Sequence, residues 1–330
     1  MPVHSPITNP VAPGMSVVIT TPDSYESIRK TMSHLRRQTG REALEIVIVA
    51  PSLAQLCVDE SEMADFGSYT VVEAGPIESI GRANALGIQR AAAPIVALAE
   101  DHCFPEPDWA DRLITAHQGV WAAVGPAFQN ANPETAISWA DLFLGYGPWL
   151  WPTAAREVDY LPGHNSSYKR DVLLGYGDRL ESMMESETVL HWDLRAKGHR
   201  LYLEPAARVS HMNFSLWRSW IPAQFLNGRL FAANRVREMS PVRRLAYAAG
   251  SPLIPLVRLL RIAGVVRSRP LVLRYIQSLP ALIVGLAVDG AAQFTGYLLG
   301  AGDTVNKIGR FEFNRVQRIT ESDRRQVLAE

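Results

Sequence analysis

Cysteine is scarce in this chain of 330 residues, which contains only Cys57 and Cys103. The two do not form a C-x-x-C motif, so the sequence fits a reducing compartment and excludes a zinc site made of cysteines. An excess of charge is lacking too, because 33 basic residues balance 33 acidic ones. Since nucleic-acid-binding domains are usually basic, we expect no nucleic-acid partner.

A secretion signal and a P-loop are also missing. Residues 1–14 are rich in proline and contain neither a basic segment nor an apolar core, so we expect a disordered lead-in rather than a signal peptide. No Lys-Ser or Lys-Thr follows a spaced pair of glycines, which excludes the P-loop mode of phosphate binding. Because we expect no signal peptide, we also expect the folded part of the chain to stay in the cytoplasm.

Short apolar runs alternate with helical patterns in the first hundred residues. The ranges 25–39 and 80–91 have the spacing of helices, and four apolar runs predict buried strands: Met15–Thr20, Glu45–Val49, Tyr69–Glu73 and Ile95–Ala99. Strands that alternate with helices indicate βαβ units. The sequence therefore predicts an α/β fold with a mainly parallel sheet flanked by helices.

The fourth apolar run ends abruptly at Glu100, Asp101 and His102. Ligands of open α/β sheets bind at the carboxyl ends of the strands. Carboxylate oxygen and imidazole nitrogen are suitable ligands for Mn²⁺ or Mg²⁺. Taken alone, the triplet is equally compatible with solvated charges in a turn.

The segments around this triplet resemble the family 2 glycosyltransferases, which have the GT-A fold. In that family an Asp-x-Asp ends the fourth strand and a Pro-x-x-Trp follows; here the triplet at 100–102 is followed at this spacing by Pro105-x-Pro107-x-Trp109. The resemblance implies that Asp101 and His102 bind a divalent metal. His211, at the end of a later apolar run, matches a further metal ligand of the family, and a set with two histidines favours Mn²⁺ over Mg²⁺.

The same resemblance covers residues 15–213 and implies a site for a nucleotide-diphosphate sugar. The residues implied to contact the donor lie at the ends of the first two strands, near the start of the helix around residue 82, at the end of the fourth strand and in a Gly-x-Asn turn: Thr20, Thr21, Pro22, Asp23, Ala50, Ser52, Arg82, Asn84, Glu100, Asp101, Gly163, His164 and Asn165. Arg82 could neutralise the diphosphate, because a guanidinium binds two phosphate oxygens at once. A solvated arginine at a helix start is the alternative.

A helix expected over residues 187–197 ends at Gly198, a typical C-terminal glycine. In the family an acidic pair opens this helix, and its second member is the catalytic base. Glu187 occupies that position, and it would take the proton of the acceptor hydroxyl in an inverting transfer. His191, one turn later, could hydrogen-bond to Glu187. The alternative for Glu187 is an acid favoured by the helix dipole alone.

The C-terminal third has seven arginines and no acidic residue between Met239 and Val288. Arginine among aliphatic residues suits a membrane interface. The range 279–301 almost reaches the length of a membrane span, but it carries Asp289, so we favour a monotopic or re-entrant arrangement. A buried helical subdomain or a dimer interface is the alternative.

These patterns predict four parts: a lead-in (1–14), a GT-A domain (15–213), a helical, arginine-rich, membrane-associated region (214–302) and a polar tail (303–330). The predicted function is inverting, hexosyltransferase-type transfer to a lipid-linked or polysaccharide acceptor at the cytoplasmic face of the cell membrane. A homo-oligomer is compatible with this prediction. The alternative is a catalytically idle GT-A scaffold of a membrane glycan-assembly complex. The catalytic interpretation requires Asp101, His102 and Glu187 to converge in space.

Overall fold

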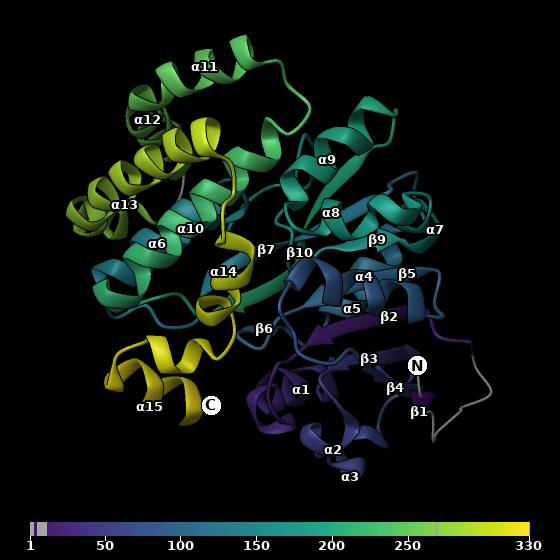
Figure 1. Ribbon diagram of the computed structural model, residues 1–330. Coiled ribbons are helices and arrows are strands. Elements are labelled where there is room, and N and C mark those ends of the chain that lie inside the picture. The colour runs from purple at the N-terminus through teal and green to yellow at the C-terminus, as the bar shows by residue number, and fades with distance from the viewer. Residues whose placement is uncertain (1–2, 5–11, 268–269, 330) are drawn as a thin grey trace. The chain divides into compact units, whose positions relative to one another are not determined.

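The protein, described as a computed structural model over residues 3–4, 12–267 and 270–329, forms two compact units (Figure 1). Unit 1 comprises Met1–Gln129 and Trp151–Ser210 and contains the sheet. Unit 2 comprises Asn130–Leu150 and His211–Glu330 and is helical. This division differs from the predicted domain 15–213 at residues 130–150 and 211–213, which belong to unit 2. Residues 130–150 do so because helix α6 (Ala136–Tyr146) packs against helix α13 (Val272–Leu299).

Over the described residues the sheet has ten strands in the order β1-β4-β3-β2-β5-β9-β7-β10-β6, and β8 pairs with β10. The pairs β2–β3, β3–β4 and β2–β5 are parallel, whereas β1–β4, β5–β9, β7–β9 and β8–β10 are antiparallel. The strands are β1 (Val3–His4), β2 (Met15–Thr20), β3 (Leu44–Ala50), β4 (Ser68–Glu73), β5 (Ile95–Ala99), β6 (Cys103–Pro105), β7 (Ala123–Asn130), β8 (Arg156–Val158), β9 (Ser167–Lys169) and β10 (Leu201–His211). The predicted α/β class and the mainly parallel first half are confirmed.

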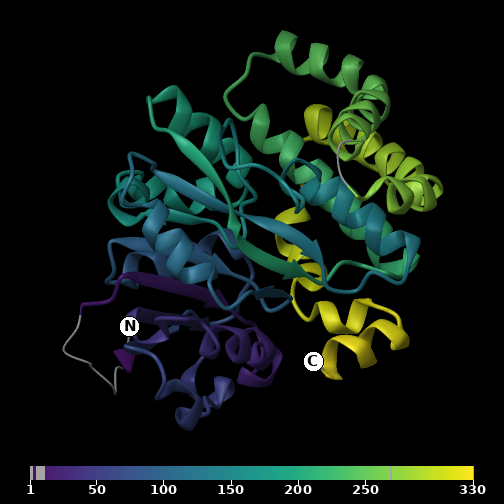
Figure 2. The ribbon, with the colours of Figure 1, turned by 180° about the vertical axis from the view of Figure 1, so that it is seen from behind.

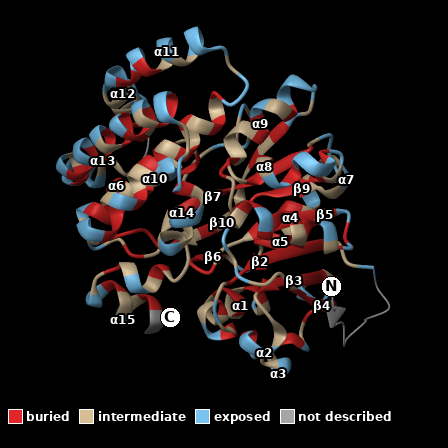
Figure 3. Cartoon of the chain, viewed as in Figure 1, coloured by how far each residue is buried: buried red, intermediate tan, exposed pale blue. Residues whose placement is uncertain are grey.

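Every residue of β2 and β3 is buried, as Figure 3 shows in red. Since side chains alternate between the two faces of a strand, both faces of the sheet are covered here. The buried Glu45 carboxylate accepts hydrogen bonds from the Ser16 hydroxyl and from Ala92 N at 2.7 Å. Those bonds explain how an acid is tolerated inside an otherwise apolar strand pair.

The helices of unit 1 lie between its strands in sequence. Gly87 lets α4 approach the sheet, because a Cβ there would come within 2.3 Å of Val18 Cγ1. The helices are η1 (Tyr25–Ser27), α1 (Arg29–Arg36), η2 (Arg41–Ala43), α2 (Leu53–Leu56), α3 (Glu60–Met63), α4 (Ile80–Arg90), α5 (Trp109–Ala116), α7 (Arg170–Leu174), η4 (Gly177–Arg179), α8 (Leu180–Met184) and α9 (Glu187–Ala196).

Three predicted elements differ in the structure. The helix expected over 25–39 is divided into η1 and α1, because Ser27 Oγ donates to Ser24 O and so supports a turn in place of a regular helix. The two strands expected around residues 200–211 form one strand, β10, in which Ala206 N next to Pro205 donates to the Glu204 side chain. Within the expected lead-in, β1 pairs with β4, and residues 5–11 lie outside the described residues.

Unit 2 is built around α13, which packs against α6, α10, α11 and α12 (Figure 2). A Cβ on Gly285 would come within 2.6 Å of Trp220, so this glycine permits the close helix contact. The predicted polar tail contains α14, η6 and α15. The elements are α6 (Ala136–Tyr146), η3 (Gly147–Trp149), α10 (Trp217–Arg235), α11 (Pro241–Gly250), η5 (Ser251–Leu253), α12 (Ile254–Val266), α13 (Val272–Leu299), α14 (Thr304–Glu312), η6 (Arg315–Arg318) and α15 (Glu321–Ala329).

Candidate active site

The carboxyl end of β5 lies beside the turn that enters β9. Antiparallel pairing of the two strands continues past their ends, because Asn165 N donates to Leu98 O at 2.6 Å and Leu98 N donates to Ser166 O at 3.2 Å. Asn165 has a φ of 59°, in the left-handed region that asparagine adopts more readily than most residues. The turn at 163–165 is thereby held next to the triplet at 100–102.

The acidic triplet is organised around the buried His102 ring. His102 Nδ1 lies 2.6 Å from Asp101 Oδ1, and His102 Nε2 lies 3.6 Å from Glu100 Oε1. Thr31 Oγ1 of α1 donates to the Glu100 carbonyl at 2.8 Å and fixes the backbone of the loop. A carboxylate that accepts from Nδ1 sets the imidazole tautomer, so Nε2 is the nitrogen that can accept or ligate.

His164 connects this triplet with Glu187. Its Nδ1 lies 3.2 Å from Glu100 Oε1, and its Nε2 lies 3.9 Å from Glu187 Oε1. The His164 side chain is 30% exposed, and the two carboxylates are 11% and 16% exposed. Three stretches far apart in the sequence therefore meet in one polar cluster that solvent can reach, which is the convergence that the catalytic interpretation requires.

Glu187 is the first residue of α9, and a buried pair of side chains holds this helix in place. Leu161 N donates to His191 Nδ1 at 3.3 Å, and Tyr168 Oη lies 2.9 Å from His191 Nε2. Both ring nitrogens of His191 thus have other partners, which differs from the expected bond to Glu187. Burial lowers the pKa of His191 to about 3, so the ring is neutral.

Tyr168 is the residue of this region that sequence reasoning missed. It comes from β9 and is completely buried, and burial together with the nearby Glu187 charge raises its pKa well above the usual value. It therefore ties the strand behind the Gly-x-Asn turn to the helix that carries Glu187. No spacing rule in the sequence pairs Tyr168 with His191, because their contact depends on how α9 packs.

Similar proteins agree on the fold. No protein-family profile matches the chain. It is 25% identical over 219 residues to the glucosyl-dolichyl phosphate glucuronosyltransferase of Haloferax volcanii, an alignment that covers 61% of this chain and 69% of the relative. The structure of the mannosyltransferase PcManGT from Pyrobaculum calidifontis, in complex with GDP-Man and Mn²⁺, superposes with a TM-score of 0.52 at 15% identity and covers 88% of this chain and 90% of PcManGT.

The chain has the GT-A fold and is similar to glycosyltransferases. GalNAc-T7, solved with UDP, GalNAc and Mn²⁺, superposes less closely, with a TM-score of 0.48 at 15% identity, over 62% of this chain. The chain spans 44% of the length of GalNAc-T7. The predicted resemblance to family 2 glycosyltransferases of the GT-A fold is confirmed.

The end of β5 carries a donor set that suits a divalent metal. Two atoms bound to one ion at about 2.1 Å are separated by roughly 3.0 Å at right angles and about 4.2 Å on opposite sides. The 3.6 Å between Glu100 Oε1 and His102 Nε2 falls within this range. One carboxylate oxygen and one imidazole nitrogen match the preference of Mn²⁺.

His211, which the sequence predicts as a metal ligand, is the last residue of β10 and belongs to unit 2. There His211 Nδ1 lies 2.8 Å from Asn213 Oδ1, and His211 Nε2 lies 3.1 Å from Tyr146 Oη. The amide oxygen accepts from Nδ1 and so orients the ring, as metal-binding histidines are usually oriented. Its role as a metal ligand stays a prediction.

The predicted nucleotide-binding residues after β2 and β3 belong to two linked loops. Gln55 Nε2 donates to Pro22 O at 2.9 Å, and Ser52 Oγ caps α2 by accepting from Gln55 N at 3.1 Å. Asp23 N donates to Thr21 Oγ1 at 3.1 Å. Hydrogen bonds within the chain therefore connect the two loops.

Four further predicted contact residues lie at the ends of β2 and β3 and on α4. Thr20 Oγ1 donates to Asn84 Oδ1 of α4 at 3.4 Å, which joins the end of β2 to that helix. Arg82 is exposed in the first turn of α4. Ala50 is buried, and its carbonyl accepts from Ala74 N at 2.8 Å. Contact of these residues with a nucleotide stays a prediction.

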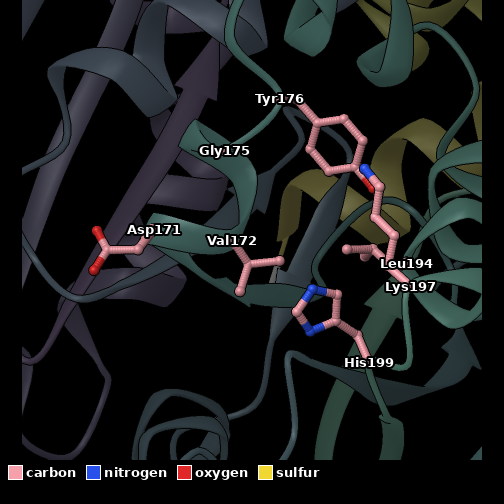
Figure 4. Close-up of a pocket in the computed structure, with 7 residues that line it drawn as sticks. All are labelled: Asp171, Val172, Gly175, Tyr176, Leu194, Lys197 and His199. Atoms are coloured by element: carbon pink, nitrogen blue, oxygen red, sulfur yellow. The ribbon is translucent and has the colours of Figure 1, made fainter.

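A separate pocket lies on the α7 and α9 side of unit 1 (Figure 4). Lys197 Nζ lies 3.9 Å from the centre of the Tyr176 ring and 2.7 Å from Asp193 Oδ2, so its charge is already compensated. None of the predicted site residues lines this pocket. Its lining consists of Asp171, Val172, Gly175, Tyr176, Leu194, Lys197 and His199.

Gly163→Ala is expected to lower sugar transfer by about 10²-fold, because small misplacements of a catalytic group have effects of this size. A Cβ at this position would lie 2.4 Å from Glu187 Cδ and would displace the carboxylate. Initial rates of transfer, compared with nucleotide-sugar binding measured by calorimetry, distinguish displacement of Glu187 from loss of the predicted contact between Gly163 and the donor. The matched control is Gly145→Ala, where a Cβ meets no atom within 4 Å; equal activity of the two variants would contradict the prediction.

Proposed function

We propose that this protein is a glycosyltransferase that moves a hexose from a nucleotide-diphosphate sugar to an acceptor hydroxyl with inversion, and that Glu187 is the general base. The observation that supports this most is the position of the His164 ring, 3.9 Å from Glu187 Oε1 and 3.2 Å from Glu100 Oε1. A base and a candidate metal-binding carboxylate thus lie on two sides of one imidazole, at the carboxyl end of β5 where ligands of such sheets bind.

In the proposed reaction Glu187 accepts the acceptor's hydroxyl proton. The acceptor oxygen forms its bond to the anomeric carbon while the bond from that carbon to the diphosphate oxygen breaks, and the diphosphate leaves with the electron pair. Attack from the face opposite the leaving group inverts the anomeric centre. A single carboxylate suffices for this step, because proton removal is the only task of the base.

Glu100 and His102 are the proposed metal ligands, with His211 as the third. Asp101, which was predicted as a ligand, is better placed to orient the His102 ring, because its carboxylate lies 2.6 Å from Nδ1. When bound, a divalent metal would neutralise charge on the diphosphate. Arg82 is proposed to contribute a second positive charge to the leaving group.

The similar proteins support the proposed donor and acceptor classes. PcManGT was solved with GDP-Man, and the Haloferax volcanii relative is a glucuronosyltransferase named for a glucosyl-dolichyl phosphate. We accordingly propose a nucleotide-diphosphate sugar as donor and a lipid-linked or polysaccharide acceptor. The proposed location is the cytoplasmic face of the cell membrane.

Hydrolysis of nucleotide sugars tests this function without the natural acceptor. We expect slow hydrolysis of one or more UDP-, GDP- or dTDP-sugars, stimulated by Mn²⁺, because water can replace the acceptor. Product release would be measured by chromatography, and binding by calorimetry. Absence of binding across all three nucleotide classes would favour the idle scaffold, an alternative kept open by Glu100 and His102 standing where the family has aspartates.

A further inference from the structure

Exposed apolar side chains concentrate on one part of unit 2. Two helical stretches of the described chain, Pro241–Val266 and Val272–Leu299, are long and apolar enough to cross a membrane by length and composition. The exposed side of α13, blue in Figure 3, carries a nearly continuous apolar stripe at helical spacing: Val272, Leu273, Ile276, Ile283, Val284, Phe294 and Leu298. Helices that face water usually carry polar residues on this side.

The opposite side of α13 is buried against its neighbours within unit 2. The side chain of Asp289, the acid within the range 279–301, is 3% exposed, and its Oδ2 lies 2.5 Å from Arg258 Nη1. Gln293 Nε2 donates to Asp289 Oδ2 at 3.0 Å, and Tyr297 Oη donates to Gln293 Oε1 at 3.0 Å. The polar groups of α13 are thus satisfied inside the helical unit.

The far side of the same unit is polar. Helix α10 packs against α13 and also against α14, and α14 carries charged residues on its surface. Asn227 Nδ2 of α10 donates to Glu312 Oε1 at 2.9 Å, and Lys307 Nζ lies 3.1 Å from Asp303 Oδ2. Because hydrocarbon excludes such groups, α13 cannot be surrounded by lipid while it keeps these partners.

Helix α12 extends the apolar surface and adds positive charge. Leu253, Leu256 and Leu260 are all more than half exposed there or just before it. Arg261 is exposed within α12, Arg267 is exposed directly after it, and Arg274 is exposed at the start of α13. Since residues 239–288 include no acid, the surface carries charge of one sign only, which complements anionic lipid headgroups.

We propose that α12 and α13 lie in the plane of an anionic lipid bilayer, with the stripe of α13 and the leucines of α12 in the outer hydrocarbon. Arg261, Arg267 and Arg274 bind the headgroup phosphates, and α13 does not cross the membrane. That this surface brings the protein to a lipid-linked acceptor rests on the proposed function. Lipid binding itself can be measured without any sugar transfer.

Flotation of the full chain with vesicles tests the surface. We expect binding to phosphatidylcholine vesicles that contain phosphatidylglycerol and much weaker binding to phosphatidylcholine alone. Leu256→Glu combined with Ile283→Glu should remove binding, whereas Val120→Glu, at a 66% exposed site in unit 1, should not. Arg261→Gln and Arg274→Gln should each weaken binding about fivefold. Because all these side chains are exposed, circular dichroism should be unchanged.

The in-plane arrangement is tested by fluorophore depth. In a Cys57→Ser background, L273C, I283C and L298C would be labelled one at a time and quenched by lipids labelled at different depths. Equal, shallow depths are expected along the helix. A deep position at residue 283 with the two end positions near opposite surfaces would mean that α13 spans the bilayer, and would overturn the proposal.

Two other results would also overturn it. One is flotation that survives the double glutamate variant. The other is unchanged flotation of that variant combined with a change from dimer to monomer mass, measured by light scattering without lipid. That result would mean that this face is a contact between two copies of the chain. Mn²⁺-stimulated hydrolysis of a soluble nucleotide sugar should be the same in all these variants, so failure here is distinguishable from failure of the proposed function.

Discussion

Glu187→Gln is expected to lower transfer to the true acceptor by a factor on the order of 10²–10⁴. The amide keeps the size of the side chain but cannot accept the proton of the acceptor hydroxyl. Binding of the nucleotide sugar should be retained, and its slow hydrolysis should be partly retained, because water needs less help from a base than a hindered acceptor does. Initial rates of transfer and hydrolysis on the same protein measure the difference.

Glu181→Gln is the matched control for this substitution. Glu181 is an exposed carboxylate on α8, shortly before α9, and it has no contact with the His164 cluster among the described residues. Its replacement should leave both rates unchanged. If Glu187→Gln lowered hydrolysis as much as transfer, or abolished nucleotide-sugar binding, the carboxylate would have a role other than that of the base.

His102→Ala is expected to weaken Mn²⁺ binding by more than about tenfold and to lower transfer by a factor on the order of 10²–10³, the size expected when a metal ligand is lost. Glu100→Gln should act in the same direction. Asp101→Asn should weaken Mn²⁺ binding by about 10–100-fold while leaving both proposed ligands in place, because it alters only the partner of His102 Nδ1. Loss of the free Mn²⁺ signal in electron paramagnetic resonance measures binding without reference to activity.

Asp108→Asn is the control for these variants, because this nearby carboxylate pairs with Arg112 on the surface at 3.2 Å. Its Mn²⁺ affinity should equal that of the unaltered protein. His211→Ala tests the third ligand, and its affinity should fall as in His102→Ala. Undiminished Mn²⁺ binding in both Glu100→Gln and His102→Ala would contradict the proposed metal site.

The sequence predicted the first half of the fold well because its signals there are local. Runs such as Met15–Thr20 and Ile95–Ala99 are wholly apolar and short, so they specify buried strands whatever their neighbours are. Competition between side-chain hydrogen bonds and a regular helix was harder to predict. The hydroxyl of Ser27 binds Ser24 O and divides the helix expected over 25–39, although the apolar spacing favoured a continuous helix.

Candidate site residues could be named from order and spacing, but their partners could not. Glu187 and His102 were chosen from motifs, whereas the position of His164 between Glu100 and Glu187 depends on how β5 pairs with β9. His191 shows the limit of helical spacing, which suggested Glu187 as its partner. Burial instead directs its two nitrogens to Leu161 and Tyr168.

The C-terminal third shows the same division between sequence and structure. Composition alone determined that residues 239–288 are apolar and basic, because those properties belong to the residues themselves. Only the tertiary structure decided which half of α13 is buried, that Asp289 pairs with Arg258, and that residues 130–150 join the helical unit. Pairing and burial depend on contacts between segments distant in sequence, and no periodicity within one segment specifies them.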